Sequence, residues 1–321
     1  MKDNTVLVLA DPNEPQLAML KELRESAEVL IGNSRDAFEK SAASASVLLN
    51  WSGSVGLLRD VLAMAPHLRW VHSRSVGLER TLFPELVENS AILTNGRGVF
   101  SASLGEFALA AILYFAKDFR RLIRNQMVHK WEQFDVEMIA GKTVGIVGYG
   151  DIGRAVAARV RPLGMKVLAL KRHSSREADP LIEKTYLRNG LLEMLSLSDY
   201  VVVSTPLTDE TRGMIAEAEF SAMKPTAVVI NIGRGPVIKE EAMISALAER
   251  RIRGAALDVF DEEPLSASHP FYKLENVLLS PHCADHTSDW LDQAMRLFIE
   301  QYERFRSGKP LLYVVDKTLG Y

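Results

Sequence analysis

The sequence Val144-Gly145-Ile146-Val147-Gly148-Tyr149-Gly150-Asp151-Ile152-Gly153 determines the architecture expected of this chain. Residues 144–147 have the apolar character of a buried strand, and apolar residues at helical spacing follow Gly153. Between them, three glycines allow a tight turn, a close approach of the backbone to a pyrophosphate, and close packing of helix on strand. A helix N-terminus also favours an anion. We therefore predict a dinucleotide site made by Gly148, Tyr149, Gly150, Asp151, Ile152 and Gly153; a purely structural turn is the alternative.

Strands and helices alternate on both sides of this turn. Strand patterns occur at residues 143–147, 166–170, 200–204, 227–231, 254–258 and 276–280, which is enough for a complete doubly wound nucleotide-binding sheet. The first hundred residues alternate in the same way, with strands at 6–9, 45–49 and 70–72 and helical patterns at 15–24 and 55–64.

A long helical stretch connects the two blocks. Residues 101 to about 130 contain one glycine, Gly105, and no proline, and a further helix is expected at 290–305. The predicted fold class is α/β, with two doubly wound parallel-sheet domains. A Rossmann nucleotide-binding domain (101–290) is inserted in a flavodoxin-like substrate domain (1–100 plus 291–321), and a cleft lies between them.

Composition restricts the possible partners and compartment. The apolar fraction of 47% and the charged fraction of 25% are typical of a soluble globular protein, and a net charge of −3 gives no general attraction to nucleic acid or anionic lipid. The single cysteine, Cys283, can form neither an internal disulfide nor a cysteine-based zinc site. His72, His129, His173 and His269 show no metal-ligand pairing. We predict a cytoplasmic protein without a metal, a membrane span or a nucleic-acid partner.

The residues after the second strand of the nucleotide-binding block bear on cofactor choice. An acid that binds the ribose hydroxyls of NAD is usual at this point. Here the chain has Lys171-Arg172-His173-Ser174 instead. Cations without a carboxylate suit the 2′-phosphate of NADP, because each charge-assisted hydrogen bond contributes about 1.5–3 kcal/mol. We predict that Lys171, Arg172 and Ser174 bind this phosphate and that NADP(H) is preferred, with NAD(H) possible; a solvated basic loop is the alternative.

Three further motifs follow later strands, at the edge where doubly wound sheets bind their ligands. They are Asn231-Ile232-Gly233-Arg234-Gly235, the stretch from Asp258 to Pro264, and Ser280-Pro281-His282. In this order after a glycine-rich turn they resemble the D-isomer-specific 2-hydroxyacid dehydrogenases, the family of glyoxylate/hydroxypyruvate reductases and phosphoglycerate dehydrogenases. The resemblance spans nearly the whole chain and includes the segment 205–211.

The resemblance implies a catalytic trio whose chemistry suits reduction of a 2-oxo acid. The guanidinium of Arg234 can bind a carboxylate bidentately and polarise the carbonyl. His282 can donate the proton, because histidine is the side chain whose unperturbed pKa is close to operating pH. Glu263 would orient the imidazole and stabilise its protonated form. His286 competes with His282 for this role, and Arg234 and Glu263 could instead be exposed loop residues.

The same resemblance implies the remaining contacts. In the first domain, the backbone amides at Ser75, Val76 and Gly77 would hold the substrate carboxylate, and Arg74 would either add charge or lie on the surface. The nicotinamide would be lined by Thr205, Pro206, Ile232 and Asp258, with Asp258 accepting from its carboxamide. We expect a homodimer formed through the long helical stretch, which reduces a small 2-oxo acid such as glyoxylate or hydroxypyruvate to the D-2-hydroxy acid. The alternatives are an NAD-linked dehydrogenase of the phosphoglycerate type and a cofactor-sensing, corepressor-like binding protein.

Overall fold

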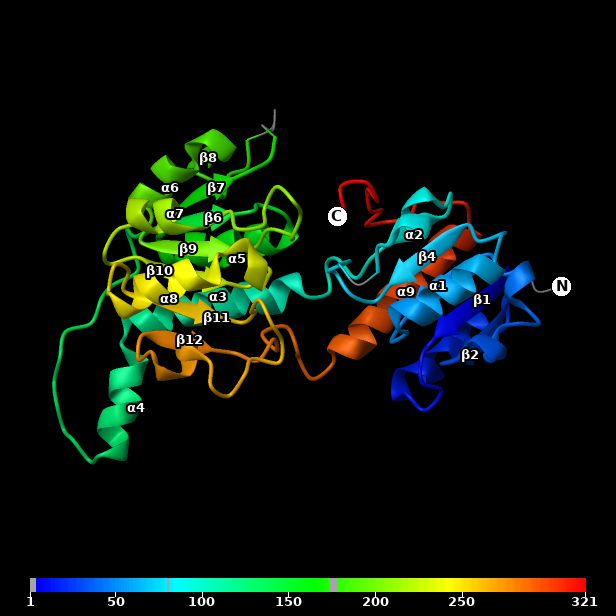
Figure 1. Ribbon diagram of the computed structural model, residues 1–321, viewed down its shortest axis with the longest axis horizontal. Coiled ribbons are helices and arrows are strands. Elements are labelled where there is room, and N and C mark those ends of the chain that lie inside the picture. The colour runs from blue at the N-terminus through cyan, green and yellow to red at the C-terminus, as the bar shows by residue number, and fades with distance from the viewer. Residues whose placement is uncertain (1–3, 80, 174–177) are drawn as a thin grey trace. The chain divides into compact units, whose positions relative to one another are not determined.

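The computed structural model describes residues 4–79, 81–173 and 178–321 (Figure 1). The chain divides into two compact units, residues 1–99 with 287–321 and residues 100–286. Each unit is built on a parallel sheet, which confirms the predicted α/β class. The assignment of the first unit to substrate and of the second to cofactor stays a prediction.

The first unit contains a five-stranded parallel sheet in the described residues, in the order β2-β1-β3-β4-β5. This is the flavodoxin-like order. The strands are β1 (Asn4–Leu9), β2 (Ala27–Gly32), β3 (Val47–Asn50), β4 (Trp70–Ser73) and β5 (Ile92–Thr94). The helices are α1 (Val55–Met64), α2 (Pro84–Glu88) and α9 (Trp290–Arg306), with 3₁₀ segments η1 (Pro15–Leu23), η2 (Arg35–Ala37) and η3 (Ala42–Ser44).

Alternate residues of these strands enter two cores, as expected for a sheet covered on both faces. Leu7 and Leu9 of β1 pack with α1 and α2, whereas Val6 and Val8 pack with η1 and α9. The C-terminal tail returns to this unit, where Lys317 Nζ donates to carbonyl oxygens at the end of α2 and just beyond it, including those of Leu86 and Ala91. The predicted helix at 15–24 is a 3₁₀ segment, and the unit contains two strands, β2 and β5, that the sequence pattern missed.

The second unit contains a seven-stranded parallel sheet in the described residues, in the order β12-β11-β10-β9-β6-β7-β8. From β6 the chain first adds β7 and β8 on one side and then β9 to β12 on the other side, as in a Rossmann fold. Its strands are β6 (Thr143–Val147), β7 (Lys166–Leu170), β8 (Lys184–Tyr186), β9 (Tyr200–Val203), β10 (Val228–Asn231), β11 (Gly254–Leu257) and β12 (Val277–Leu279). The short strand β8 is additional to the six that were predicted.

Helices cover both faces of this second sheet (Figure 1). One face carries α6 (Leu191–Leu197), α7 (Glu217–Ala222) and α8 (Glu240–Ala248), and the other carries α3 (Ser101–Ala116) and α5 (Asp151–Val160). The described part of this unit also contains the 3₁₀ segments η4 (Arg161–Leu163), η5 (Arg188–Gly190), η6 (Gly235–Val237) and η7 (Pro270–Lys273).

The long helical stretch is not one helix, so the prediction of a continuous helix to about residue 130 was wrong. It ends at Ala116 and restarts as α4 (Phe119–Met127). Asp118 separates the two parts with a left-handed backbone (φ 49°), and its carboxylate caps α4 by accepting from the Arg121 amide at 3.3 Å. Aspartate is among the residues that tolerate this conformation. After α4, residues 128–141 run back to β6 without regular structure.

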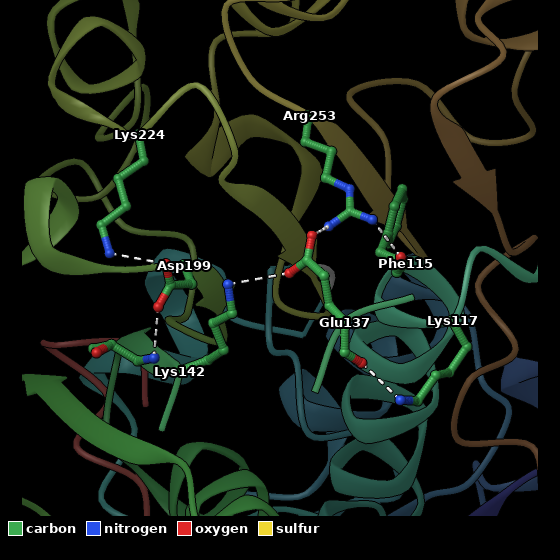
Figure 2. A network of polar contacts seen from close by, with 8 residues as sticks. Phe115, Lys117, Glu137, Lys142, Asp199, Lys224 and Arg253 are labelled. Atoms are coloured by element: carbon green, nitrogen blue, oxygen red, sulfur yellow. Dashed lines mark hydrogen bonds and ion pairs between the residues drawn. The ribbon is translucent and has the colours of Figure 1, made fainter. Parts of the chain in front are cut away.

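A polar network anchors the end of this returning segment (Figure 2). The Glu137 carboxylate receives Arg253 at 2.7 Å and Lys142 at 3.1 Å, and Lys117 donates to the Glu137 carbonyl at 2.6 Å. Nearby, Asp199 accepts from Lys224 and from the first amide of β6, both at 2.8 Å. The segment is therefore fixed where it rejoins the sheet, while α4 and the residues after it stand off the body of the unit (Figure 1).

Candidate active site

The glycine-rich turn joins β6 to α5 as the sequence predicts. Gly148 has a left-handed backbone (φ 93°), and a Cβ there would lie 2.7 Å from the Thr205 backbone, so the turn requires glycine. A Cβ on Gly150, by contrast, would have no atom within 4 Å. Gly150 precedes the first residue of α5, Asp151, and Ile152 and Gly153 lie in its first turn. An open backbone before a helix N-terminus fits the pyrophosphate of a dinucleotide.

The end of β7 carries a basic group that rests on the glycine-rich turn. Lys171 Nζ lies 4.9 Å from the centre of the Tyr149 ring. Asp179 accepts from the Tyr149 hydroxyl at 3.1 Å and from Arg154 Nε at 3.0 Å. Burial and the Asp179 charge raise the pKa of the Tyr149 hydroxyl, so tyrosine stays a neutral donor. Arg172 is exposed and pairs with Glu210 at 3.1 Å, and the predicted Ser174 lies outside the described residues.

The strands β9 and β10 end at residues predicted to line the nicotinamide. Thr205 and Ile232 are buried, with 8% and 3% of their surfaces exposed. The carbonyl of Pro206 accepts from the Thr211 hydroxyl at 2.7 Å, which closes the loop after β9. These residues border the same edge of the sheet as Gly148 because parallel strands end there together.

Arg234 lies in a turn that its own neighbours hold. The side chain of Asn231, the last residue of β10, accepts from the Gly233 amide and donates to the Arg234 carbonyl, both at 3.1 Å. A Cβ on Gly235 would lie 2.0 Å from the Phe260 carbonyl carbon, so only glycine fits there. The guanidinium donates to the Gly233 carbonyl at 2.7 Å, and the residue is half-buried. The turn presents a partly exposed cation at the carboxyl edge of the sheet.

His282 and Glu263 form a direct pair. Nδ1 of His282 lies 2.7 Å from Oε2 of Glu263, whose Oε1 accepts from the Phe260 amide at 2.9 Å. His286 lies instead by Asp285, with 3.7 Å between Nε2 and Oδ1. With Nδ1 on the carboxylate, Nε2 is the atom of His282 left for a reacting group, and 42% of its side chain is exposed. Of the two histidines, His282 therefore has the arrangement of a catalytic acid.

Asp258 fixes the turn that carries His282. Its carboxylate is buried, and Oδ1 accepts from the Ser280 hydroxyl at 2.5 Å and from the amides of Cys283 and Ala284 at 3.0 and 3.1 Å. His282 itself has a left-handed backbone (φ 52°), which these bonds on both sides help to hold. The predicted contact of Asp258 with a carboxamide would therefore use its other oxygen, Oδ2.

The predicted substrate loop follows β4 in the first unit. The carbonyls of Ser75 and Val76 accept from the Gly96 amide at 3.3 Å and from the Asn95 side chain at 2.9 Å. Within the described chain, the amides of residues 75–77 make no hydrogen bond. The carbonyls are thus held on one side while the amides stay available to an anion. Arg74, which precedes Ser75, is half-buried, with 22% of its side chain exposed.

Two kinds of feature are absent from the described residues. No group of three or more histidine, cysteine, aspartate or glutamate side chains is arranged to hold a metal ion. Likewise, no helix there combines the length and apolar character that crossing a membrane requires.

Comparison with known proteins identifies the family. The sequence profile described as "D-isomer specific 2-hydroxyacid dehydrogenase, NAD binding domain" matches residues 109–284. The chain belongs to the D-isomer specific 2-hydroxyacid dehydrogenase family. It is 35% identical to a glyoxylate reductase of Thermococcus gammatolerans over 272 residues, which cover 81% of this chain and 80% of that protein. A glyoxylate reductase of Aeropyrum pernix is also 35% identical, over 81% of this chain and 80% of its own length.

Solved structures of this dehydrogenase family share the fold over the full length. An NADPH-dependent glyoxylate/hydroxypyruvate reductase of Sinorhizobium meliloti, in complex with NADP and sulfate, superposes with a TM-score of 0.85 at 29% identity, covering 99% of this chain and 100% of its own. A Xanthobacter autotrophicus dehydrogenase in complex with NADPH gives 0.85 at 27% identity, covering 99% of both chains. The chain is therefore an NAD(P)-dependent oxidoreductase similar to glyoxylate/hydroxypyruvate reductases, which confirms the resemblance seen in the motifs.

Several residues that shape these sites had no role predicted from the sequence. Asn231 and Asn95 hold the turns of Arg234 and of the substrate loop, and Ser280 holds the turn of His282. An asparagine two residues before a glycine is a signal for the first of these, because its side chain can bond to the backbone two residues on. The contacts of Asn95 with Val76 and of Asp179 with Tyr149 join residues that are distant in sequence, so no local signal predicts them.

Proposed function

We propose that this dehydrogenase reduces a small 2-oxo acid to the D-2-hydroxy acid, with NADPH as the preferred cofactor and glyoxylate and hydroxypyruvate as the first substrates to test. The observation that carries the proposal is the 2.7 Å contact between Glu263 and His282, at the same carboxyl edge of the sheet as the turn that presents Arg234. This reduction needs a proton donor, which a histidine paired with a carboxylate can be, and a cation for the substrate carboxylate, which a guanidinium can be.

Each residue then has one chemical role. Arg234 binds the substrate carboxylate and polarises the carbonyl at C2, and the amides of residues 75–77 bind the carboxylate as well. The nicotinamide, when bound, supplies a hydride to the C2 carbon. As the carbonyl π bond breaks, His282 Nε2 gives its proton to the oxygen, so the product is an alcohol. Glu263 stabilises the imidazolium before this transfer and keeps Nε2 directed away from itself.

The residues of the second unit fit a dinucleotide on structural grounds. The space above Gly150 would take the pyrophosphate, and Asp258 Oδ2, Thr205 and Ile232 would border the nicotinamide. Lys171 and Arg172 would bind the 2′-phosphate that distinguishes NADP from NAD. The crystallised relatives with NADP or NADPH support this preference.

A homodimer is part of the same proposal. The segment from α4 to residue 138 exposes a series of large apolar side chains, among them Met127 at 76% and Trp131 at 95%. A patch of this kind on a folded chain indicates a surface that another molecule covers. We assign it to a second copy of the chain. A cytoplasmic location stays a prediction from the single cysteine.

Steady-state oxidation of NADPH and NADH with a panel of 2-oxo acids tests the proposal. We expect turnover with NADPH, and a decrease in kcat of about 10²–10⁴-fold in His282→Ala with NADPH binding unchanged. His286→Ala is the matched control, because it removes a neighbouring histidine that lies by Asp285. Unchanged turnover in His282→Ala, or cofactor binding without turnover in the wild type, would contradict the assignment; the second result favours a sensor.

A further inference from the structure

Arg74 packs against residues from other segments of the first unit. Its guanidinium carbon lies 4.9 Å from the ring centre of Trp51 and 5.4 Å from that of Trp290. Trp51 follows β3, Arg74 follows β4 and Trp290 begins α9. Trp51 is almost fully buried, and its indole nitrogen donates to Glu14 at 2.5 Å. Two indole rings therefore hold the guanidinium in one orientation, the geometry of a cation–π pair.

The guanidinium lacks the partners that its burial requires. Within the described chain it makes no hydrogen bond, and the nearest carboxylate oxygen is Glu14 Oε2 at 3.9 Å. Glu14 is itself taken by Trp51 and by the Ser52 hydroxyl. Burial lowers the pKa of Arg74 and the Glu14 charge partly restores it, so the group stays charged. The guanidinium has five N–H donors, and no group of the described chain accepts a hydrogen bond from them. It is therefore suited to bind an anion, and its planar fork matches a carboxylate.

A second anion site adjoins it in the chain. The amides of residues 75–77 are available, as described above, and the proposed function gives them the C1 carboxylate. Arg74 directly precedes them, and it adds a full positive charge that a substrate with one carboxylate does not need. Two adjacent anion sites on one unit fit a ligand with two anionic groups.

We infer that the acid reduced by this enzyme carries a second carboxylate, and that Arg74 binds it while the amides of residues 75–77 hold the first. The substrate class is then a short 2-oxo dicarboxylic acid, such as oxaloacetate or 2-oxoglutarate. The inference rests on the proposed function for the reaction and deepens it in the identity of the substrate. Arg74 acts here as a specificity residue, with no part in proton transfer.

A purely structural role for Arg74 predicts different behaviour. If the arginine only joined two tryptophans, its replacement would change stability and affect all substrates alike. Arg59 is the matched control for such an effect, because it lies 4.9 Å from the Phe83 ring and 3.6 Å from Glu85 in the same unit. Arg59→Met thus removes a guanidinium from a ring and a carboxylate without touching either anion site.

Kinetics with one and two carboxylates test the inference. In the wild type, kcat/KM should be higher for oxaloacetate or 2-oxoglutarate than for glyoxylate. Arg74→Met should raise KM for the dicarboxylates about ten- to a hundredfold, the loss of a charge-assisted bond, with kcat and the glyoxylate KM within twofold. Arg74→Lys should fall between, and Arg59→Met should match the wild type. An equal rise in KM for glyoxylate would place Arg74 on the first carboxylate and overturn the inference, as would no change at all.

A binding measurement separates this inference from the proposed reaction. Trp51 and Trp290 flank Arg74, so D-malate, a dicarboxylate hydroxy acid, should change the intrinsic fluorescence of the protein in the absence of cofactor. Arg74→Met should abolish this saturable change, and Arg59→Met should retain it. Saturable binding without turnover of any 2-oxo acid would support the site while refuting the reaction. Absence of binding in the wild type, or binding equal in Arg74→Met, would refute the site.

Discussion

The pair of Glu263 and His282 combines two residues that lie on separate loops, after β11 and after β12. The charge of Glu263 matters more than the hydrogen bond alone, because the protonated imidazole must persist until it gives up its proton. Glu263→Gln keeps an oxygen for Nδ1 but removes the charge. We expect kcat to fall about ten- to a hundredfold, with cofactor affinity unchanged. Glu262→Gln, the exposed neighbour, should match the wild type in the same assay. A wild-type kcat in Glu263→Gln would show that the carboxylate only positions the ring.

His72 predicts a pH dependence of stability in the first unit. Its ring is buried against Trp70 and Phe298, with Nδ1 2.8 Å from the Thr94 hydroxyl, and burial lowers its pKa from 6.5 to about 3. Below pH 6.5 the unfolded chain binds a proton that the folded chain does not. The free energy of unfolding should therefore be highest above pH 6.5 and fall towards pH 3, by up to about 1.4 kcal/mol per pH unit.

Urea unfolding of the protein between pH 4 and pH 8 measures this slope. His72→Gln removes the titrating ring, so the slope should flatten by the share due to His72, even though the variant is less stable at neutral pH. His67→Gln replaces an exposed histidine of the same unit and should keep the wild-type slope. Equal slopes in His72→Gln and the wild type would refute the assignment.

Individual residues show where sequence reasoning succeeds and fails. Arg234, Glu263 and His282 stand in ordered motifs at strand ends, so the chain itself indicates that they belong to one edge of a sheet. The stacking of Arg74 between Trp51 and Trp290 could not be read in this way. Its partners are distant in sequence, and nothing local distinguishes Arg74 from a surface arginine.

At the scale of elements, the loop after β7 gives a prediction for cofactor choice. Lys171→Ala with Arg172→Ala should raise KM for NADPH about ten- to a hundredfold and leave KM for NADH within twofold, because only NADPH carries the 2′-phosphate. Lys184→Ala is the control, since Lys184 also lies over a tyrosine ring, that of Tyr186 at 4.3 Å, in the neighbouring strand. An equal rise in KM for both cofactors would show that the basic loop does not distinguish NADPH from NADH.

Helices and strands were predicted best where the local sequence pattern alone determines their type and bounds. The bounds of β6 and β7 were predicted as observed because both strands are apolar and end at glycine or charge. Strand β8 was missed, since Lys184-Thr185-Tyr186 is a short edge strand with two exposed residues that depends on pairing with β7. The break between α3 and α4 was missed for a similar reason. The break falls at Lys117 and Asp118, where there is no glycine or proline to signal it. The turn is stabilised instead by the Asp118 cap and by the contact of Lys117 with Glu137.

At the scale of the whole molecule, the anchored segment of Figure 2 explains how an apolar surface can be exposed and yet ordered. Glu137 and its three basic partners fix the end of the segment, and the hydrogen bond from Asn125 to Glu132 at 3.1 Å joins it to α4. A groove beside α4 is lined by Tyr114, Ile123 and Met127, with Arg120, Arg124 and Glu275 around it. The same patch thus holds both a groove and a protruding indole, Trp131. Such a surface can be self-complementary, as a two-fold interface requires.

Charge placed on this patch should dissociate the proposed dimer. Ile123→Glu with Met127→Glu puts two carboxylates on the exposed side of α4, where burial against a second copy would leave them unpaired at a large cost. We expect sedimentation equilibrium to show a monomer for this variant and a dimer for the wild type, with Trp131→Ala weakening the dimer alone. Leu192→Glu, on the exposed face of α6 with 47% of its surface accessible, is the control for an added charge and should remain dimeric. A monomeric wild type would refute the dimer. A dimeric double variant would refute this surface as the interface, because no α4-centred contact could tolerate both carboxylates.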